Sequence, residues 1–218
     1  MKPTFSFFAA ASLLLLAALT SAQAQVPTDA ADVKPLLPGL TAPAFSATTA
    51  SGDTFTLDPA SMERPAVLIF YRGGWCPFCN LYWSKLREIE EEMAAMNQDV
   101  VFISPDRPEL LAEALADEED QPSYLLASDG DSKIAEAFGI AFRVDDETYK
   151  RMKQYEYDLE EISGFKHRQL PAPAVFIVDT DGIIKFSYVN PDYKVRLHPD
   201  VLLAAASNLS GFTLKMQR

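Results

Sequence analysis

The sequence predicts an α/β protein in which helices flank a central mixed sheet. Three observations favour this fold class. An apolar strand, a helix and a second apolar strand follow one another between residues 66 and 104, as in a parallel crossover unit. A strand hairpin and a last helix end the chain. The only two cysteines, Cys76 and Cys79, stand where the first of these strands passes into its helix.

The first elements form a hairpin ahead of the main sheet. Ala44 to Phe45 and Thr54 to Leu57 flank the turn residues Ser51-Gly-Asp53. Ala66 to Tyr71 is continuously apolar, as expected of a buried central strand. A helix is expected from Pro77 to about Asn97, because its apolar residues recur at steps of three and four.

The elements after this helix complete the sheet and its covering helices. They are a strand at Val100 to Ser104, a helix at Glu109 to Glu119, a strand at Tyr124 to Ala127 and a helix at Lys133 to Phe138. Ala174 to Val178 and Ile183 to Val189 are expected to pair around Asp181-Gly182, a strong hairpin signal, before a helix from about Pro199 to Asn208.

The segment from Phe142 to Gln169 is longer than a simple connection and rich in tyrosine and charge. We expect part of it to be helical. Long insertions are often functional, so we favour a position over the active-site face, where it would select substrates, over a plain surface elaboration.

The chain divides into three segments. Residues 1–24 have one lysine, an apolar run from Phe5 to Leu19 and the small-residue site Ala22-Gln-Ala24, which predict a signal peptide cleaved after Ala24 and export, to the periplasm in a bacterial host. A membrane anchor is the alternative, but the run is shorter than the roughly 20 residues that a spanning helix needs. Residues 25–40 are expected to be a flexible leader, and 41–218 a single domain with no stable membrane anchor.

The net charge of −12 argues against nucleic acid as a partner, because phosphate backbones attract basic surfaces.

The Cys-x-x-Cys spacing at a helix start predicts a redox-active dithiol. Pro77 suits the first helical position, which places Cys76 at the N-cap, where unpaired N–H groups and the helix dipole favour a thiolate. Cys79 begins the buried stripe of the helix. We therefore expect an outward Cys76 and a shielded Cys79. The rest of that stripe is Tyr82, Leu86, Ile89, Met93 and Met96.

Other uses of the two cysteines compete with this interpretation. A structural disulfide is disfavoured because so small a ring constrains little of the unfolded chain. Zinc would need two more ligands, and only His167 and His198 remain as histidines. Two ordinary buried thiols would leave the strand-to-helix placement unexplained. We predict no bound cofactor and no metal.

From about Gly39 to its C-terminus the chain resembles the peroxiredoxin-like branch of the AhpC/TSA (alkyl hydroperoxide reductase and thiol-specific antioxidant) family, within the thioredoxin-like fold. The matching pieces are Phe-Tyr-Arg-Gly-Gly-Trp-Cys-Pro-Phe-Cys, Leu-Pro-Ala-Pro-Ala-Val-Phe-Ile-Val-Asp and Tyr-Val-Asn-Pro-Asp-Tyr. The resemblance implies an antioxidant thiol oxidoreductase that reduces hydroperoxides and is itself reduced by a thioredoxin-like protein or another dithiol.

The chain departs from both parent patterns of this resemblance. By the peroxiredoxin pattern Cys79 is the peroxide-attacking cysteine, but the pattern's threonine falls on Cys76 and its later arginine on Pro173. Thioredoxins place a proline, usually cis, where Pro173 stands, facing the dithiol. They also carry a buried acid where this chain has Phe70.

Three residues are expected to position the substrate. Pro173 would do so as thioredoxins use their proline, Trp75 as a shape element beside the dithiol, and Arg72 as a nearby cation that lowers the pKa of Cys76. The alternative for Arg72 is a solvated charge at the end of a strand.

Two redox mechanisms stay open, together with a binding role. In the peroxidase version Cys79 attacks the O–O bond of the peroxide and becomes a sulfenic acid, with which Cys76 then condenses. In the disulfide-exchange version, which acts on exported proteins, Cys76 attacks a substrate disulfide and Cys79 resolves the mixed disulfide. A module that holds copper on its thiolates is a less favoured alternative.

Overall fold

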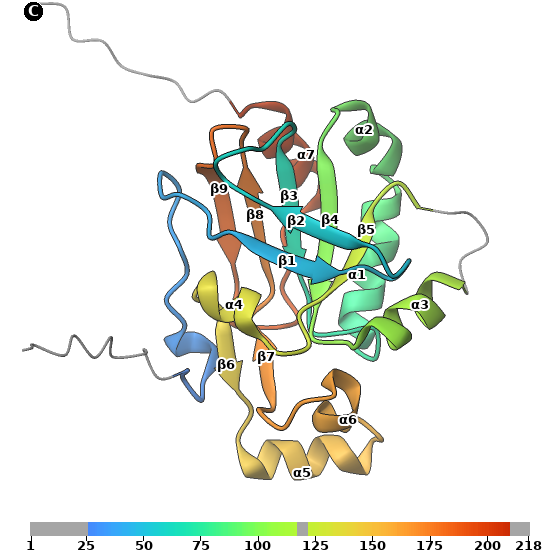
Figure 1. Ribbon diagram of the computed structural model, residues 1–218. Helices are drawn as coiled ribbons and strands as arrows, with labels where there is room; N and C mark the ends of the chain where they lie inside the picture. The colour runs from blue at the N-terminus through green and yellow to red at the C-terminus, as the bar shows by residue number, and fades with distance from the viewer. Residues whose placement is uncertain (1–25, 117–121, 210–218) are drawn as a thin grey trace, which may run out of the picture.

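The computed structural model describes residues 26–116 and 122–209. Its centre is a mixed sheet in the strand order β5-β4-β3-β8-β9, with helices on both faces (Figure 1). The strands are β3 (Ala66–Phe70), β4 (Asp99–Ser104), β5 (Leu125–Ser128), β8 (Ala174–Val178) and β9 (Ile184–Val189). The predicted fold class is confirmed.

The central strand β3 explains why the sheet separates two hydrophobic cores. All five of its residues are buried, since β3 is parallel to β4 on one side and antiparallel to β8 on the other. Its side chains alternate between the faces. Leu68 and Phe70 enter one core, whereas Val67 and Ile69 enter the other.

One face of the sheet is covered by the N-terminal hairpin and a short helix. The hairpin pairs β1 (Phe45–Thr48) with β2 (Thr54–Leu57), and it crosses the sheet beside α4 (Lys133–Ala137) (Figure 1). The hairpin and α4 were both predicted within a few residues of their observed bounds.

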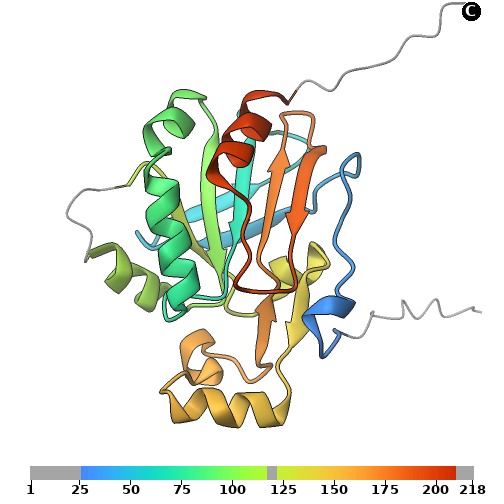
Figure 2. The same cartoon turned by 180° about the vertical axis from the view of Figure 1, so that it is seen from behind.

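The opposite face is covered by α1 (Pro77–Arg87), α2 (Glu90–Ala95) and α7 (Pro199–Ser207), as Figure 2 shows. α3 (Pro108–Ala116) lies beside β5, and its predicted extension to Glu119 falls outside the described residues. The two cysteines belong to the core on this face.

The single helix predicted from Pro77 to Asn97 is wrong in one respect, because it breaks between Arg87 and Glu90. The new helix start places Glu90, Glu91 and Glu92 at a positive dipole end, which stabilises α2.

The insertion between α4 and β8 has its own small core. It contains β6 (Ala141–Arg143), α5 (Asp146–Gln154), α6 (Leu159–Ser163) and β7 (Gln169–Pro171), and β6 pairs with β7. The expected helices are present, and the short strand pair was not predicted. Trp75 packs against this core, so the insertion lies beside the dithiol.

Residues 25–40 were expected to be a flexible leader, and the structure instead attaches 26–40 to the domain. The Lys34 N–H donates to Gly139 O at 2.9 Å, and the Gly39 N–H to Ile184 O at 2.8 Å. Val26 and Leu36 pack on the core beneath the hairpin. Residues 1–25, which include the predicted signal peptide, lie outside the described residues. Within the described part, no helix is long and apolar enough to cross a membrane.

Candidate active site

The two cysteines are free thiols at the N-terminus of α1. Cys76 is the N-cap residue, Pro77 follows at the first helical position, and the Cys79 N–H donates to Cys76 O at 2.9 Å. The predicted N-cap placement is confirmed. The expectation of an outward Cys76 is wrong, because Cys76 is 1% exposed and Cys79 4% exposed. Both cysteines belong to one core, against which Trp75 also packs.

The two sulfurs are hydrogen-bonded to each other. The thiol of Cys79 donates to the Cys76 sulfur, and this contact, together with the Cys79 backbone N–H, lowers the pKa of Cys76 to about 6. Donating that hydrogen bond, together with burial, raises the pKa of Cys79. At neutral pH the pair therefore holds one proton between two sulfurs and carries one negative charge.

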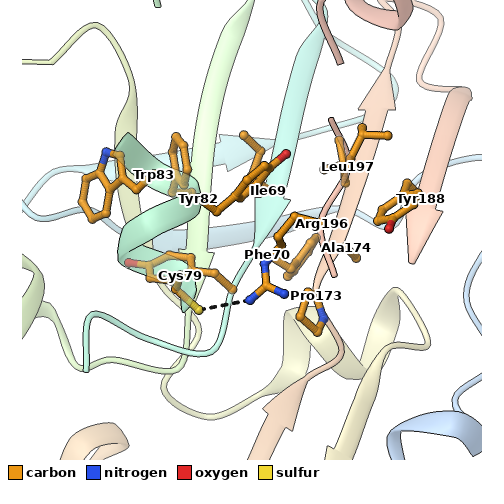
Figure 3. Close-up of a pocket in the computed structure, with 13 residues that line it drawn as sticks. Ile69, Phe70, Cys79, Tyr82, Trp83, Pro173, Ala174, Tyr188, Arg196 and Leu197 are labelled. Atoms are coloured by element: carbon orange, nitrogen blue, oxygen red, sulfur yellow. Dashed lines mark hydrogen bonds between the residues drawn. The ribbon is translucent and has the colours of Figure 1, made fainter. Parts of the chain in front are cut away.

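Arg196 is a site residue that the sequence analysis missed. Its Nη2 donates to Cys79 Sγ at 3.4 Å (Figure 3). The carbonyl groups of Tyr193 and Val195 hold the guanidinium in place. Arg196 lies in the loop between β9 and α7, 117 residues after Cys79, and no local spacing points to it. The one hint in the sequence is its position three residues after Tyr193, where the family-like segment Tyr-Val-Asn-Pro-Asp-Tyr ends.

Arg72 and Trp75, both predicted site residues, lie together beside the dithiol. The Arg72 guanidinium lies 5.1 Å from the Trp75 ring centroid and 4.3 Å from that of Tyr193. Its charge contributes to the low pKa of Cys76, and its backbone N–H donates to the Cys79 sulfur. Trp75 packs on Tyr157 of the insertion, with ring centroids 5.0 Å apart.

Pro173 is brought to the site because it precedes β8, whose first residue pairs with the last residue of β3. It lines a small cavity together with Cys79 and Arg196, as Figure 3 shows. The cavity is about 10 Å³, room for about one water molecule. The peptide bond before Pro173 is trans, because no cis bond occurs in the described residues. In this respect Pro173 differs from the usually cis proline of thioredoxins, and its role in positioning the substrate stays a prediction.

A buried acid lies on the loop after β4. Asp106 accepts a hydrogen bond from the Gly74 N–H at 2.8 Å and another from Ser104 Oγ at 3.0 Å. It is 3% exposed, and burial raises its pKa to about 6. Phe70 stands where thioredoxins carry their buried acid, and it packs in the core on the opposite face of the sheet. Asp106 instead supports the turn that leads to Cys76.

The remaining candidates do not join this site. His167 Nε2 contacts Gly130 O at 2.7 Å, and His198 caps α7. Across residues 26–116 and 122–209, no group of three or more histidine, cysteine or acidic side chains is placed to hold a metal ion.

Comparison with known proteins places this geometry in a family. A sequence model of the AhpC/TSA family matches residues 38–187. The chain is 29% identical over 172 residues to peroxiredoxin Bcp of Escherichia coli K12, covering 78% of this chain and 96% of that protein.

Solved structures show the same fold. The peroxidoxin BcpB of Mycobacterium tuberculosis superposes with a TM-score of 0.58 and 21% identity, covering 80% of this chain and 98% of that one. A peroxiredoxin-like protein from Aquifex aeolicus gives a TM-score of 0.59 and 20% identity, covering 81% and 90%.

Proposed function

The chain belongs to the AhpC/TSA family, and we propose on that basis that it is a thiol peroxidase, which reduces hydroperoxides through a dithiol–disulfide cycle of Cys76 and Cys79. The observation that carries the proposal is the buried pair of hydrogen-bonded sulfurs with a guanidinium donating to one of them. A charged donor beside a sulfur favours the thiolate, the form that attacks an O–O bond.

Cys79 is the attacking sulfur in this proposal. It occupies the family position, it lines the small cavity and it accepts the hydrogen bond from Arg196. The resting negative charge is centred on Cys76, so the shared proton must first move from the Cys79 sulfur to the Cys76 sulfur. This transfer runs along the hydrogen bond that already joins them. It leaves a Cys79 thiolate facing Arg196.

The chemistry then proceeds in two steps. The Cys79 thiolate attacks one peroxide oxygen, the O–O bond breaks, and the alkoxide takes a proton and leaves as an alcohol or water. Cys79 is now a sulfenic acid. The Cys76 sulfur attacks it, an S–S bond forms, and the hydroxyl group leaves as water with the proton of the Cys76 thiol. The two sulfurs together supply the two electrons that the peroxide takes up.

A dithiol donor must reopen the disulfide, and a thioredoxin-like protein is the partner that the family favours. We also propose that the protein is exported to the periplasm after cleavage behind Ala24. Support for export comes from the composition of residues 1–24 alone. N-terminal sequencing of protein recovered from a periplasmic extract tests it, and a mature chain that begins at Met1 would contradict it.

The first experiment is stopped-flow oxidation of the reduced protein by hydrogen peroxide and, separately, by a small disulfide. We expect peroxide to oxidise the wild type at least about 100-fold faster than a free thiol, because a positioned, charge-stabilised thiolate does the attack. Cys79→Ser should abolish this rate.

In Cys76→Ser, a sulfenic acid should accumulate at Cys79 and be trapped by a sulfenate-specific reagent, since the second sulfur is absent. The opposite result, a slow reaction with peroxide and a fast Cys76-dependent reaction with the disulfide, would show that the protein is a thiol–disulfide oxidoreductase.

A further inference from the structure

Two guanidinium groups face the dithiol, which supplies only one negative charge. Arg196 donates to Cys79 Sγ, and the charges of both sulfurs act on Arg72. The reduced pair shares one proton, so it neutralises one of the two cations.

No carboxylate in the described residues neutralises the second cation. Arg196 uses its Nη1 on two backbone carbonyls, and neither arginine forms an ion pair with an aspartate or glutamate described here. The strongest charge effects on Arg72 come from Cys76, Cys79, Tyr193 and Arg196, none of which is an acid of the usual ion-pairing kind. Both arginines are half-buried, and a cation that is partly removed from water without a partner is costly.

The surroundings of Arg72 leave its donor edge unused. The rings of Trp75 and Tyr193 lie against the guanidinium, whereas its hydrogen-bond donors project in the guanidinium plane. Arg72 Nε is buried and has no acceptor. Such a planar edge matches the two oxygens of a carboxylate.

Oxidation of the dithiol increases this imbalance. When the disulfide forms, two electrons leave the sulfur pair, the last thiol proton leaves, and the thiolate charge disappears. Arg72 and Arg196 then face a neutral disulfide, whose sulfurs are weak acceptors. A monovalent anion would restore the balance that the thiolate provided.

We propose that Arg72 and Arg196 form a carboxylate-binding site whose affinity is higher in the disulfide form of the protein, because in the dithiol form the protein's own thiolate competes with the ligand for the two cations. The ligand is a small monocarboxylate, held at its oxygens by the arginine pair. The exposed ring of Phe78, which contacts Tyr193 at a centroid distance of 5.6 Å, provides an apolar rim for the rest of such a ligand.

The site predicts a linkage between ligand and redox state. A ligand that binds the disulfide form more tightly than the dithiol form stabilises the disulfide against reduction. At a concentration ten times its dissociation constant from the disulfide form, a carboxylate that binds the dithiol form tenfold more weakly should shift the disulfide-to-dithiol equilibrium about fivefold toward the disulfide.

The test measures acetate binding by calorimetry to full-length protein oxidised with diamide and to protein kept reduced, with acetamide as the neutral ligand of matching shape. We expect acetate to bind the oxidised form at least about tenfold more tightly than the reduced form, and acetamide to bind neither. Arg72→Gln, which keeps the Arg72 backbone N–H, should remove the difference. Lys194→Gln, which removes an exposed cation also near the Tyr193 ring, should preserve it.

Equal binding to both redox forms, equal binding of acetamide, or an equal loss in Lys194→Gln would overturn the proposal. If Arg72→Gln does not fold, the comparisons of redox form and of ligand on the wild type still decide it. The inference needs only that the disulfide forms, and diamide forms it without peroxide. Failure to bind acetate therefore leaves the peroxidase proposal standing, and a protein that peroxide does not oxidise can still bind acetate.

Discussion

Arg196 is the only side chain from outside α1 and its preceding loop for which a hydrogen bond to a sulfur is found in the described residues. An opposite charge within hydrogen-bond distance commonly lowers a pKa by 1–3 units. The contact joins Cys79 to the loop that follows the last strand, so a residue far along the chain adds a positive charge beside the helix N-terminus.

We predict that Arg196→Gln raises the pKa at which the dithiol first ionises by about one unit, because one of two nearby cations is lost. Oxidation by peroxide at pH 7 should slow about twofold, in proportion to the thiolate fraction, because a rise of the pKa from about 6 to about 7 leaves about half of the dithiol ionised. Thiolate absorbance as a function of pH measures the first effect and stopped-flow oxidation the second. Lys194→Gln is the matched control and should change neither. An unchanged pKa in Arg196→Gln would show that Arg196 does not contribute to it and that the hydrogen bonds from Cys79 and the charge of Arg72 are sufficient.

Asp106 predicts a dependence of stability on pH. Burial raises its pKa from 3.8 to about 6, so the folded state favours the protonated acid. Its contribution to stability is complete below the unfolded value and is lost as the pH rises through about 6. Asp129, whose pKa burial raises to about 7, acts in the same direction. For Asp106 the loss amounts to about 3 kcal/mol.

Asp106→Asn should therefore lose less stability than the parent chain between about pH 4 and pH 7, by about 3 kcal/mol. Urea unfolding at several pH values measures how the free energy of unfolding of each protein changes with pH. The comparison is made in a Cys76→Ser background, so that the Cys76 thiol does not titrate in the same range. Asp32→Asn, at an exposed residue, is the control. Parallel slopes for Asp106→Asn and its parent would contradict the shifted pKa.

The site residues that are close together in the chain could be predicted from the sequence. Those that only the fold brings together could not. Cys76 and Cys79 follow from spacing and from Pro77. Arg196 and Asp106 come from separate loops, and their roles depend on which strand ends meet at one edge of the sheet. The burial of Cys76 was missed for the same reason, since it depends on a core to which several elements contribute.

At the scale of elements, the insertion is joined to the loop before Cys76 through Trp75. Tyr157, from the turn between α5 and α6, packs on Trp75, the residue before Cys76. An aromatic pair of this kind contributes about 0.5–1.5 kcal/mol beyond its buried area. Neighbouring Tyr155 is 72% exposed, and no ring contact of its own is found in the described residues.

Tyr157→Ala should raise the rate at which iodoacetamide alkylates Cys76 by about five- to tenfold, because losing about 1 kcal/mol of packing makes opening around Trp75 that much more frequent. Mass spectrometry of the reduced protein measures the rate at each cysteine. Tyr155→Ala should leave both rates unchanged. If both variants raise the rate equally, the effect belongs to the insertion as a whole and not to the contact with Trp75.

At the scale of the whole molecule, alternating and continuous apolar runs predicted each central strand to within one or two residues. The prediction of strands succeeds because the apolar pattern of a strand directly reflects whether one or both of its faces are buried. The leader shows where this fails. Residues 26–40 have no regular apolar period, and their attachment depends on backbone hydrogen bonds to distant elements, Gly139 and Ile184 among them.

Gly139 is the position at which this attachment is tightest. Its φ is +71°, and a Cβ there would lie 2.1 Å from the Lys34 carbonyl oxygen. An alanine at position 139 would destabilise the fold in two separate ways. The left-handed backbone costs about 1–2 kcal/mol in any chain. The clash with Lys34 arises only when the leader is bound.

We predict that a chain beginning at Thr41 is less stable than one beginning at Gln25 by about 3 kcal/mol, because it loses the packing of Val26 and Leu36 and the hydrogen bonds to Gly139 and Ile184. Gly139→Ala should destabilise the longer chain more than the shorter one, since only the longer chain has the Lys34 carbonyl to meet. Urea midpoints of the four proteins measure both effects. Equal effects of Gly139→Ala in the two chains would mean that the leader does not lie against Gly139, and equal midpoints for the two starting points would mean that it does not stabilise the domain.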